Sequence, residues 1–443
     1  MLAAEKPVAI FRELPERLSD ARRRSDALFA MVRSDFLYER PIPERHRIIF
    51  YVGHLEAFDW NLLNKDCFGL KSVHPEFDRL FAFGIDPVGG GLPTDQPADW
   101  PSLDAVRHYV SRVRSVLDES LANVISESDF RTRDGFPLRT LLNVAVEHRL
   151  MHVETLSYML HQLPYHMKVR ASDSPPPVGS PVIPDVVSIP ASVVTLGLSR
   201  DAGAFGWDNE FEANSVEVPA FEIDKYKVTN RQYLEFVMAD GYRTRAVWSD
   251  DDWNWKTNHG ISHPLFWKSD GKRWFWRSMF DEVPLPLDWP VYVSHAEASA
   301  YARWAGKSLP TEAEWQRAAY GAYPSGDDFE GADANRTEKR GNFDFCRWDP
   351  VPVNAFPEGQ SAFGVQGILG NGWEWTSSIF APFPGFEPFP FYRGYSADFF
   401  DGKHFVMKGG SARTAACMLR PTFRNWFQAH YQYVYAGFRC ARR

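Results

Sequence analysis

The sequence is poor in cysteine and has no long apolar run. Only four cysteines occur among 443 residues, and no two of them form a Cys-x-x-Cys pair. We therefore expect neither a disulfide framework nor a closed structural zinc site, and a reducing cytoplasm suits such a chain. No stretch of about 18 apolar residues is present to span a bilayer. Residues 1–26 lack an apolar segment flanked by a cleavage site, so we expect no signal peptide and no membrane partner.

The chain lacks an excess of positive charge, whereas aromatic side chains are abundant. The formal net charge is −8, with 49 Lys and Arg against 57 Asp and Glu. Nonspecific nucleic-acid binding requires a basic surface, so we expect no nucleic-acid partner. The chain contains 16 Trp, 17 Tyr and 34 Phe. Such side chains bury large areas and also form walls around planar or cationic ligands.

The first third of the chain has the periodicity of helices. Apolar residues recur at three- and four-residue spacing, and Ser102 stands where a helix N-cap is expected. The pattern predicts a four-helix bundle over residues 9–168, a scaffold that can build metal sites from inward-facing side chains. The four helical stretches are residues 14–36, 48–68, 102–125 and 137–163.

A Pro- and Ser-rich stretch separates this bundle from a second domain. Residues 169–184 cannot form a helix or a central strand, so they are interpreted as a linker. Over residues 185–443, short β-like runs alternate with Gly, Pro and Asn turns. Two segments there look helical, 229–240 and 294–306, and each begins at a Thr or Ser cap. The predicted fold class is therefore multidomain α+β.

Three histidines on the predicted bundle helices are candidate metal ligands. His148 and His152 are four residues apart, which places them on one face of a helix, and His54 lies in a different helical stretch. Three neutral imidazoles leave open positions on a divalent ion, as a catalytic metal requires. The alternative is that each is a core histidine bonded to a carbonyl. Glu154 lies about 200° around the helix from His152, so it is interpreted as a solvated, capping or supporting residue rather than a ligand.

Both parts of the chain resemble known families. Residues 185–443 carry "LPTEAEW", "GNGWEWTSS" and "AGFR", and they resemble the formylglycine-generating-enzyme fold, a variant of the C-type-lectin fold. Residues 9–168, with a His-x3-His-x-Glu motif, resemble a DinB-type bundle. The order of the two resembles the ergothioneine sulfoxide synthases, which are non-haem iron enzymes. The resemblance implies Fe(II) bound by His54, His148 and His152, with O2 as co-substrate and hercynine as substrate.

The same resemblance implies roles for residues near the end of the chain. In the family an Asn-Trp pair lines the pocket for the betaine, which here is Asn425 and Trp426 in "RNW". A family tyrosine near the iron donates a proton, and "FPFYRGYSADFF" offers Tyr392 and Tyr395. Core packing is the alternative for Trp426, and packing within a loop is the alternative for either tyrosine.

The sequence departs from the family where the sulfur donor is bound. The family clamps the carboxylates of γ-glutamylcysteine with arginines, but from Leu80 to Val106 there is no Arg or Lys. Phe427 and Tyr431 stand where an Asp and an Arg are usual, and Met151 replaces a Gln. Aromatic rings with Asp and Gln side chains suit a neutral polyol better than a dicarboxylate.

These departures resemble the selenoneine synthases, a subgroup that joins hercynine to a selenosugar. The residues implicated in substrate binding are Asn425, Trp426, Phe427, Tyr431, Asp95, Gln96 and Met151. Three alternatives stay open: a sulfoxide synthase using a thiol donor, a zinc-dependent thiol transferase, and a lectin-like binding protein. Formylglycine generation is not expected, because Cys417 and Cys440 do not match the cysteine pattern of that chemistry.

Overall fold

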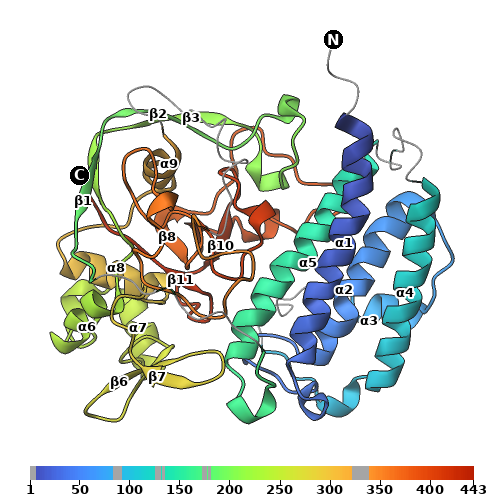
Figure 1. Cartoon of the computed structure of the whole chain (residues 1–443), viewed down its shortest axis with the longest axis horizontal. Helices are drawn as coiled ribbons and strands as arrows, with labels where there is room; N and C mark the ends of the chain where they lie inside the picture. The colour runs from blue at the N-terminus through green and yellow to red at the C-terminus, as the bar shows by residue number, and fades with distance from the viewer. Residues whose placement is uncertain are drawn as a thin grey trace. The chain divides into compact units, whose positions relative to one another are not determined.

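The computed structural model describes residues 6–82, 92–124, 131, 135–171, 177, 181–321 and 339–443. The chain divides into two compact units, Met1–Ala171 and Ser172–Arg443 (Figure 1). Most of the Pro- and Ser-rich segment after Ala171, residues 172–176 and 178–180, lies outside the described part of the chain.

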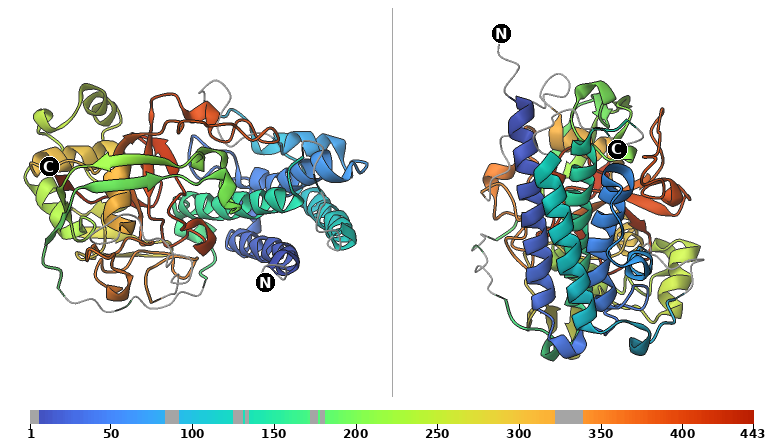
Figure 2. Two further views of the ribbon diagram at one scale, coloured as in Figure 1. Left: turned by 90° about the horizontal axis from the view of Figure 1, so that it is seen from above. Right: turned by 90° about the vertical axis from the view of Figure 1, so that its right-hand side faces the viewer.

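The first unit is a bundle of four long helices, as the sequence predicts. Figure 2 shows α1 and α5 running side by side, and α2 packs along α4 as well as against α5. A short additional helix, α3, was not expected from the sequence, and α2 is prolonged by a π-helical turn over Asn64–Phe68. The helices are α1 (Lys6–Ala30), α2 (Ile48–Leu63), α3 (Pro75–Leu80), α4 (Leu103–Val124) and α5 (Leu138–His161).

Local sequence signals explain two of the helix starts. The Ser102 hydroxyl oxygen accepts a hydrogen bond from the Ala105 backbone N–H at 3.3 Å, which confirms Ser102 as the cap of α4. At α3 the cap is His74, whose Nδ1 accepts from the Phe77 N–H at 3.3 Å, and Pro75 occupies the first helical position.

Helix α5 is buried over most of its circumference. Apolar side chains such as Leu141 and Leu156 are fully buried, but so are the charged side chains Glu147 and Arg149. Since a buried polar group is costly unless it has partners, the interior of this bundle must contain a polar network.

The described residues of the second unit form four small sheets. Strand β10 pairs antiparallel with β9, β9 with β8, and β11 lies parallel to β8. The other sheets have the strand orders β1-β4-β12, β2-β3 and β5-β6-β7. The strands are β1 (Val186–Ile189), β2 (Ser192–Leu196), β3 (Asn214–Val218), β4 (Phe221–Asp224), β5 (Trp267–Ser269), β6 (Trp274–Arg277), β7 (Glu282–Pro284), β8 (Trp373–Ile379), β9 (His404–Lys408), β10 (Asn425–Gln428), β11 (Ala436–Gly437) and β12 (Ala441–Arg442).

Helices α6 (Asn230–Met238) and α8 (His295–Trp304) confirm the two helical segments expected in this unit. The prediction that only two helices occur was wrong, since α7 (Asp250–Asn258) and α9 (Glu312–Tyr320) are also present. Helix α9 begins with a capping box between Thr311 and Glu314. Both helices begin at a Ser or Thr cap, Ser249 for α7 and Thr311 for α9, and these caps are the local signals that mark them.

Buried ion pairs support the sheets of the second unit. Arg439 and Glu374, both fully buried, form a bidentate pair with N–O distances of 2.5 and 2.9 Å. The Lys227 ammonium lies 3.0 Å from the same carboxylate. These contacts join β8 to the segment between β11 and β12. Within the described part of the chain, no helix combines the length and apolar character needed to cross a membrane.

Candidate metal centre

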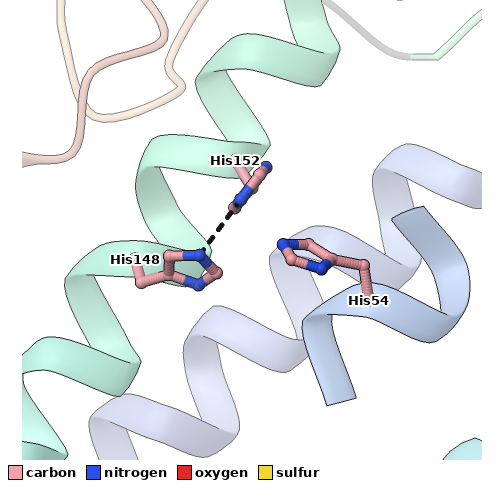
Figure 3. A group of neighbouring side chains, drawn as sticks. All are labelled: His54, His148 and His152. Carbon is pink, nitrogen blue, oxygen red and sulfur yellow. Dashed lines mark hydrogen bonds between the residues drawn. The ribbon is translucent and has the colours of Figure 1, made fainter. Parts of the chain in front are cut away.

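Three histidine side chains from two helices of the first unit converge on one point. His54 lies on α2, whereas His148 and His152 lie on α5, and Figure 3 shows the three rings directed toward one another. Each offers a nitrogen, and these nitrogens lie within 4.8 Å of one another. All three side chains are buried, with exposed fractions of 4–5%. The structure thus brings together the three residues that the sequence singled out.

The distances within this group suit a metal ion. The Nε2 atoms of His148 and His152 are 3.2 Å apart. Two imidazole nitrogens at about 2.0–2.1 Å from an ion and at right angles to each other lie about 3 Å apart. Three imidazoles are ligands that Zn, Cu, Fe and Ni all accept. The residues present therefore fit a divalent first-row ion with open positions.

Neighbouring groups fix the orientation of His54. Its Nδ1 lies 2.7 Å from the Phe81 carbonyl oxygen, so Nδ1 carries the proton and Nε2 is left as the free electron donor. The preceding residue, Gly53, makes this contact feasible. A Cβ atom at Gly53 would meet the Phe81 ring at 2.6 Å, so a larger residue would displace both Phe81 and its carbonyl.

Aromatic rings from α2 flank two of the imidazoles. Phe50 stacks on His54 with centroids 4.9 Å apart, and Phe58 stacks on His148 at 3.4 Å. Phe50, His54 and Phe58 follow one another at four-residue intervals and therefore share a helix face. This stripe gives the site apolar walls that limit access of water.

Burial keeps the three imidazoles neutral. It lowers the pKa of His54 to about 4, although the Phe81 carbonyl opposes the shift. Burial, followed by repulsion from neighbouring histidines, lowers the pKa of His148 and of His152 well below 6.5. Since only a neutral imidazole has a lone pair to share with a metal, the site is prepared for an ion at neutral pH.

Two other residues of α5 were singled out from the sequence. Glu154 is only 6% exposed, so the interpretation of a solvated glutamate is wrong. Met151, assigned to substrate binding, is half-buried next to His152.

Asp95 is engaged by groups that lie far away in the sequence. Its carboxylate accepts hydrogen bonds from Arg40 at 2.6 Å, Arg47 at 3.0 Å and the Trp100 indole at 2.8 Å. The absence of Lys and Arg from residues 80–106 therefore does not leave Asp95 without positive charge nearby, because two arginines from the segment before α2 contact it. Gln96 is exposed and its side chain donates to the Thr94 carbonyl at 3.1 Å.

This loop also reaches the walls of the histidine cluster. The Trp100 ring lies 5.8 Å from that of Phe50 and 6.2 Å from that of Phe81. Phe50 and Phe81 are the residues that contact His54. The loop is thus connected through aromatic packing to one of the three candidate ligands.

In the second unit, four of the predicted substrate-binding or catalytic residues form a cluster. Trp426 on β10 stacks on Phe380 at 4.2 Å and meets Tyr395 edge-on at 5.4 Å. Tyr392 lies 5.5 Å from Tyr395, and the Asn425 side-chain oxygen accepts from the Trp426 N–H. Trp426 is half-buried, which leaves part of its ring accessible to a ligand.

Two further predicted residues, Phe427 and Tyr431, stack on each other with centroids 4.8 Å apart. Both are half-buried. The neighbouring His430 was not predicted from the sequence. Its Nε2 lies 2.9 Å from a carboxylate oxygen of Asp252, and its ring stacks on Trp255 at 4.6 Å. The Ser-x-x-Asp signal at the start of α7 would have indicated where Asp252 lies.

Comparisons with known proteins match the two units to two families. A Sulfatase-modifying factor enzyme 1-like domain matches residues 173–443, and the DinB superfamily matches residues 17–156. The first match agrees with the mixed helices and sheets of the second unit, and the second match with the helical bundle.

Proteins similar over both units carry related names. Hercynine oxygenase of Mycolicibacterium thermoresistibile is 32% identical and the alignment covers 97% of this chain and 94% of that protein. Hercynine oxygenase of Mycobacterium tuberculosis is 35% identical over 76% of this chain and 77% of that protein. Ergothioneine biosynthesis protein 1 of Neurospora crassa is 29% identical over 93% of this chain and 55% of that protein. The chain therefore belongs to the hercynine oxygenase family, with a DinB-superfamily bundle followed by a sulfatase-modifying-factor domain.

Proposed function

We propose that this protein is a non-haem Fe(II), O2-dependent enzyme that attaches a chalcogen atom to the imidazole C2 carbon of hercynine. The observation that carries the proposal is the group of three buried, neutral histidines whose nitrogens lie within 4.8 Å of one another. The names of the relatives, hercynine oxygenase and ergothioneine biosynthesis protein 1, give the acceptor.

The chemistry explains why an oxidant is needed. Replacing the C2–H bond of an imidazole by a bond to selenium or sulfur removes electrons, and O2 accepts them. Bound iron would supply a place to hold O2 together with a soft anionic donor. In this proposal His54, His148 and His152 hold the ion, and the apolar stripe of Phe50 and Phe58 keeps bulk water from the reacting groups.

Hercynine itself carries a trimethylammonium group, which has no hydrogen to donate. An aromatic face is the natural partner for such a cation. We assign that role to Trp426, whose ring is half-buried, and assign the carboxylate end of hercynine to Asn425. Tyr395 lies beside Trp426, and Tyr392 lies beside Tyr395; either hydroxyl is the proposed proton donor.

For the donor we propose a selenosugar. The Asp95 carboxylate already pairs with both Arg40 and Arg47, so it offsets one of their two positive charges and competes with the carboxylates of a donor for the two guanidinium groups. The stacked pair Phe427 and Tyr431 offers the aromatic surface on which sugar rings pack. We also assign Gln96, Met151 and Asp95 to donor binding, and Asp95 lowers the attraction of Arg40 and Arg47 for a carboxylate by offsetting one of their two charges.

A set of turnover reactions tests both parts of the proposal, the O2-dependent reaction of hercynine and the choice of a selenosugar as donor. Fe(II)-loaded full-length protein is incubated aerobically with hercynine and either a selenosugar, γ-glutamylcysteine or free cysteine, and products are identified by mass spectrometry. We expect an O2-dependent product with the isotope pattern of selenium, and none from H152A. Rapid turnover with γ-glutamylcysteine would overturn the choice of donor. Equal activity with Zn²⁺ in the absence of O2 would overturn the oxidative reaction.

A further inference from the structure

Arg149 occupies an unusual place beside the histidine cluster. It directly follows His148 on α5, and consecutive residues point about 100° apart around a helix, so its side chain leaves the helix on a different side from the His148 imidazole. The residue is 0% exposed. A fully buried guanidinium needs compensating partners, and these partners identify its role.

The contacts of Arg149 lead directly to the other ligand-bearing helix. Its Nη2 donates to the Leu55 carbonyl oxygen at 2.9 Å, and Leu55 is the residue that follows His54. The same nitrogen donates to the Asp59 carboxylate at 2.7 Å, and Nη1 donates to Glu56 at 3.0 Å. A residue adjacent to one candidate ligand is therefore bonded to the backbone beside another.

Further charged side chains surround the contact between Arg149 and α2. Glu56 and Asp59 are 1% and 0% exposed, and the Arg114 guanidinium on α4 also donates to Glu56 at 2.7 Å. Asp26 on α1 accepts from Arg114 at 2.7 Å. The network thus joins α1, α2, α4 and α5 in one layer of the bundle. Arg149 differs from Arg114 in one respect that matters here, which is its bond to the main chain of α2.

Buried ion pairs often contribute little to net stability, because the cost of desolvation offsets the attraction between the charges. Their better-supported role is to specify one arrangement of packed elements over others. Apolar packing alone allows a helix to shift slightly along its neighbour, whereas a metal site requires its ligands to be placed within about 0.5 Å. A planar guanidinium bonded to a carbonyl and two carboxylates removes that freedom.

We propose that Arg149 is a positioning residue that fixes the register of α2 against α5 and thereby holds His54 within reach of an ion bound by His148 and His152. The inference rests on the metal site of the proposed function, and it adds a determinant of that site outside the three histidines. Arg149 acts here through the helix backbone and touches neither the ion nor a substrate.

The test measures metal affinity rather than turnover. Co(II) is titrated into the apo full-length protein and the visible absorption of the bound ion is followed. We expect R149K, which keeps the charge but loses the planar fork, to bind Co(II) about tenfold more weakly than the wild type, in the range seen when groups supporting metal ligands are altered. The matched control is R114K, which perturbs the same carboxylate without touching the α2 backbone, and its affinity should stay within about twofold.

Two double substitutions complete the test. R149M/D59L separates weaker metal binding from loss of folding, and H54A/R149K tests whether Arg149 acts through His54. R149M/D59L removes one positive and one negative charge together, a change that is often neutral for stability, and it should fold while also binding Co(II) about tenfold more weakly. In the H54A background, R149K should cause no further loss, because Arg149 acts through His54. Unchanged affinity in R149K, or an undiminished loss in H54A/R149K, would overturn the inference. A wild-type protein that binds no Co(II) would overturn the proposed function together with it.

Discussion

The depressed pKa values of the histidine cluster predict an unusual pH dependence of metal binding. Protons compete with a metal for the same imidazole nitrogens, so lowering the pH weakens binding once the ligands begin to protonate. The perturbation is a change from pH 7.5 to pH 5.5 in the folded apo protein. The outcome depends on whether the three imidazoles behave like ordinary histidines or like the buried ones in this structure.

The expected magnitudes differ by orders of magnitude. An ordinary histidine with a pKa near 6.5 is about 9% neutral at pH 5.5, so three such ligands would weaken metal binding roughly a thousandfold. Burial lowers the pKa of His54 to about 4, at which it is still about 97% neutral at pH 5.5. His148 and His152 are shifted in the same direction. We therefore expect the affinity to fall by less than about threefold over this interval.

Competition titrations of Co(II) against a chelator, corrected for protonation of the chelator, measure this difference. Circular dichroism must accompany them, because the same shift affects folding. The unfolded chain binds protons near pH 6.5 and folded His54 only near pH 4. Its contribution to stability is therefore lost as the pH falls from 6.5 towards 4, by about 1.4 kcal/mol per unit. A loss of affinity that begins near pH 6.5 in protein that remains folded would refute the reasoning.

Three further predictions concern the second unit. W426L should raise the KM for hercynine about tenfold, which is the size of a desolvated cation–π contact. W426F, which keeps an aromatic ring, should raise the KM less, and neither change should alter the metal content. A KM of W426L equal to that of the wild type in steady-state assays would contradict the assignment. Burial raises the pKa of Asp208 to about 6 from 3.8, so its stabilising contribution is complete below pH 3.8 and is lost as the pH rises through 6. In urea titrations D208N should therefore gain about 2 kcal/mol relative to wild type between pH 4 and pH 7, and a constant difference would argue against the shift. R439M leaves the buried Glu374 carboxylate paired with Lys227 but without its bidentate arginine partner, and it should cost about 3 kcal/mol of unfolding free energy. R443M, at a half-exposed pair, should cost less than about 1 kcal/mol.

The sequence predicts those parts of the fold that depend on local patterns. Helical periodicity located the four long helices of the bundle, and the caps at Ser102, Thr229 and Ser294 were visible as single residues followed by apolar repeats. The four-residue spacing of His148 and His152 predicted that they share a helix face. Helix α9 escaped notice although Thr311 begins it with an equally local signal.

Contacts between distant residues were beyond the reach of local patterns. Asp95 pairs with Arg40 and Arg47, which lie 55 and 48 residues away, so the sequence of the loop alone does not show which charges surround it. Arg149 and Asp59 are 90 residues apart. The convergence of His54 with the other two histidines likewise depends on how α2 and α5 pack, which one sequence does not specify without a resemblance to guide it.

The arginine network has a consequence for the charge of the metal centre. Glu56 is only two residues from His54, and carboxylates are strong ligands for divalent ions, yet Glu56 and Asp59 are each bonded to arginine. Burial alone would raise the pKa of Glu56, but Arg149, Arg114 and Arg22 hold it well below its usual value. An ion held by imidazoles alone retains both of its positive charges. In the proposed function, the charge of the metal would therefore be neutralised by an anion that binds together with the substrates.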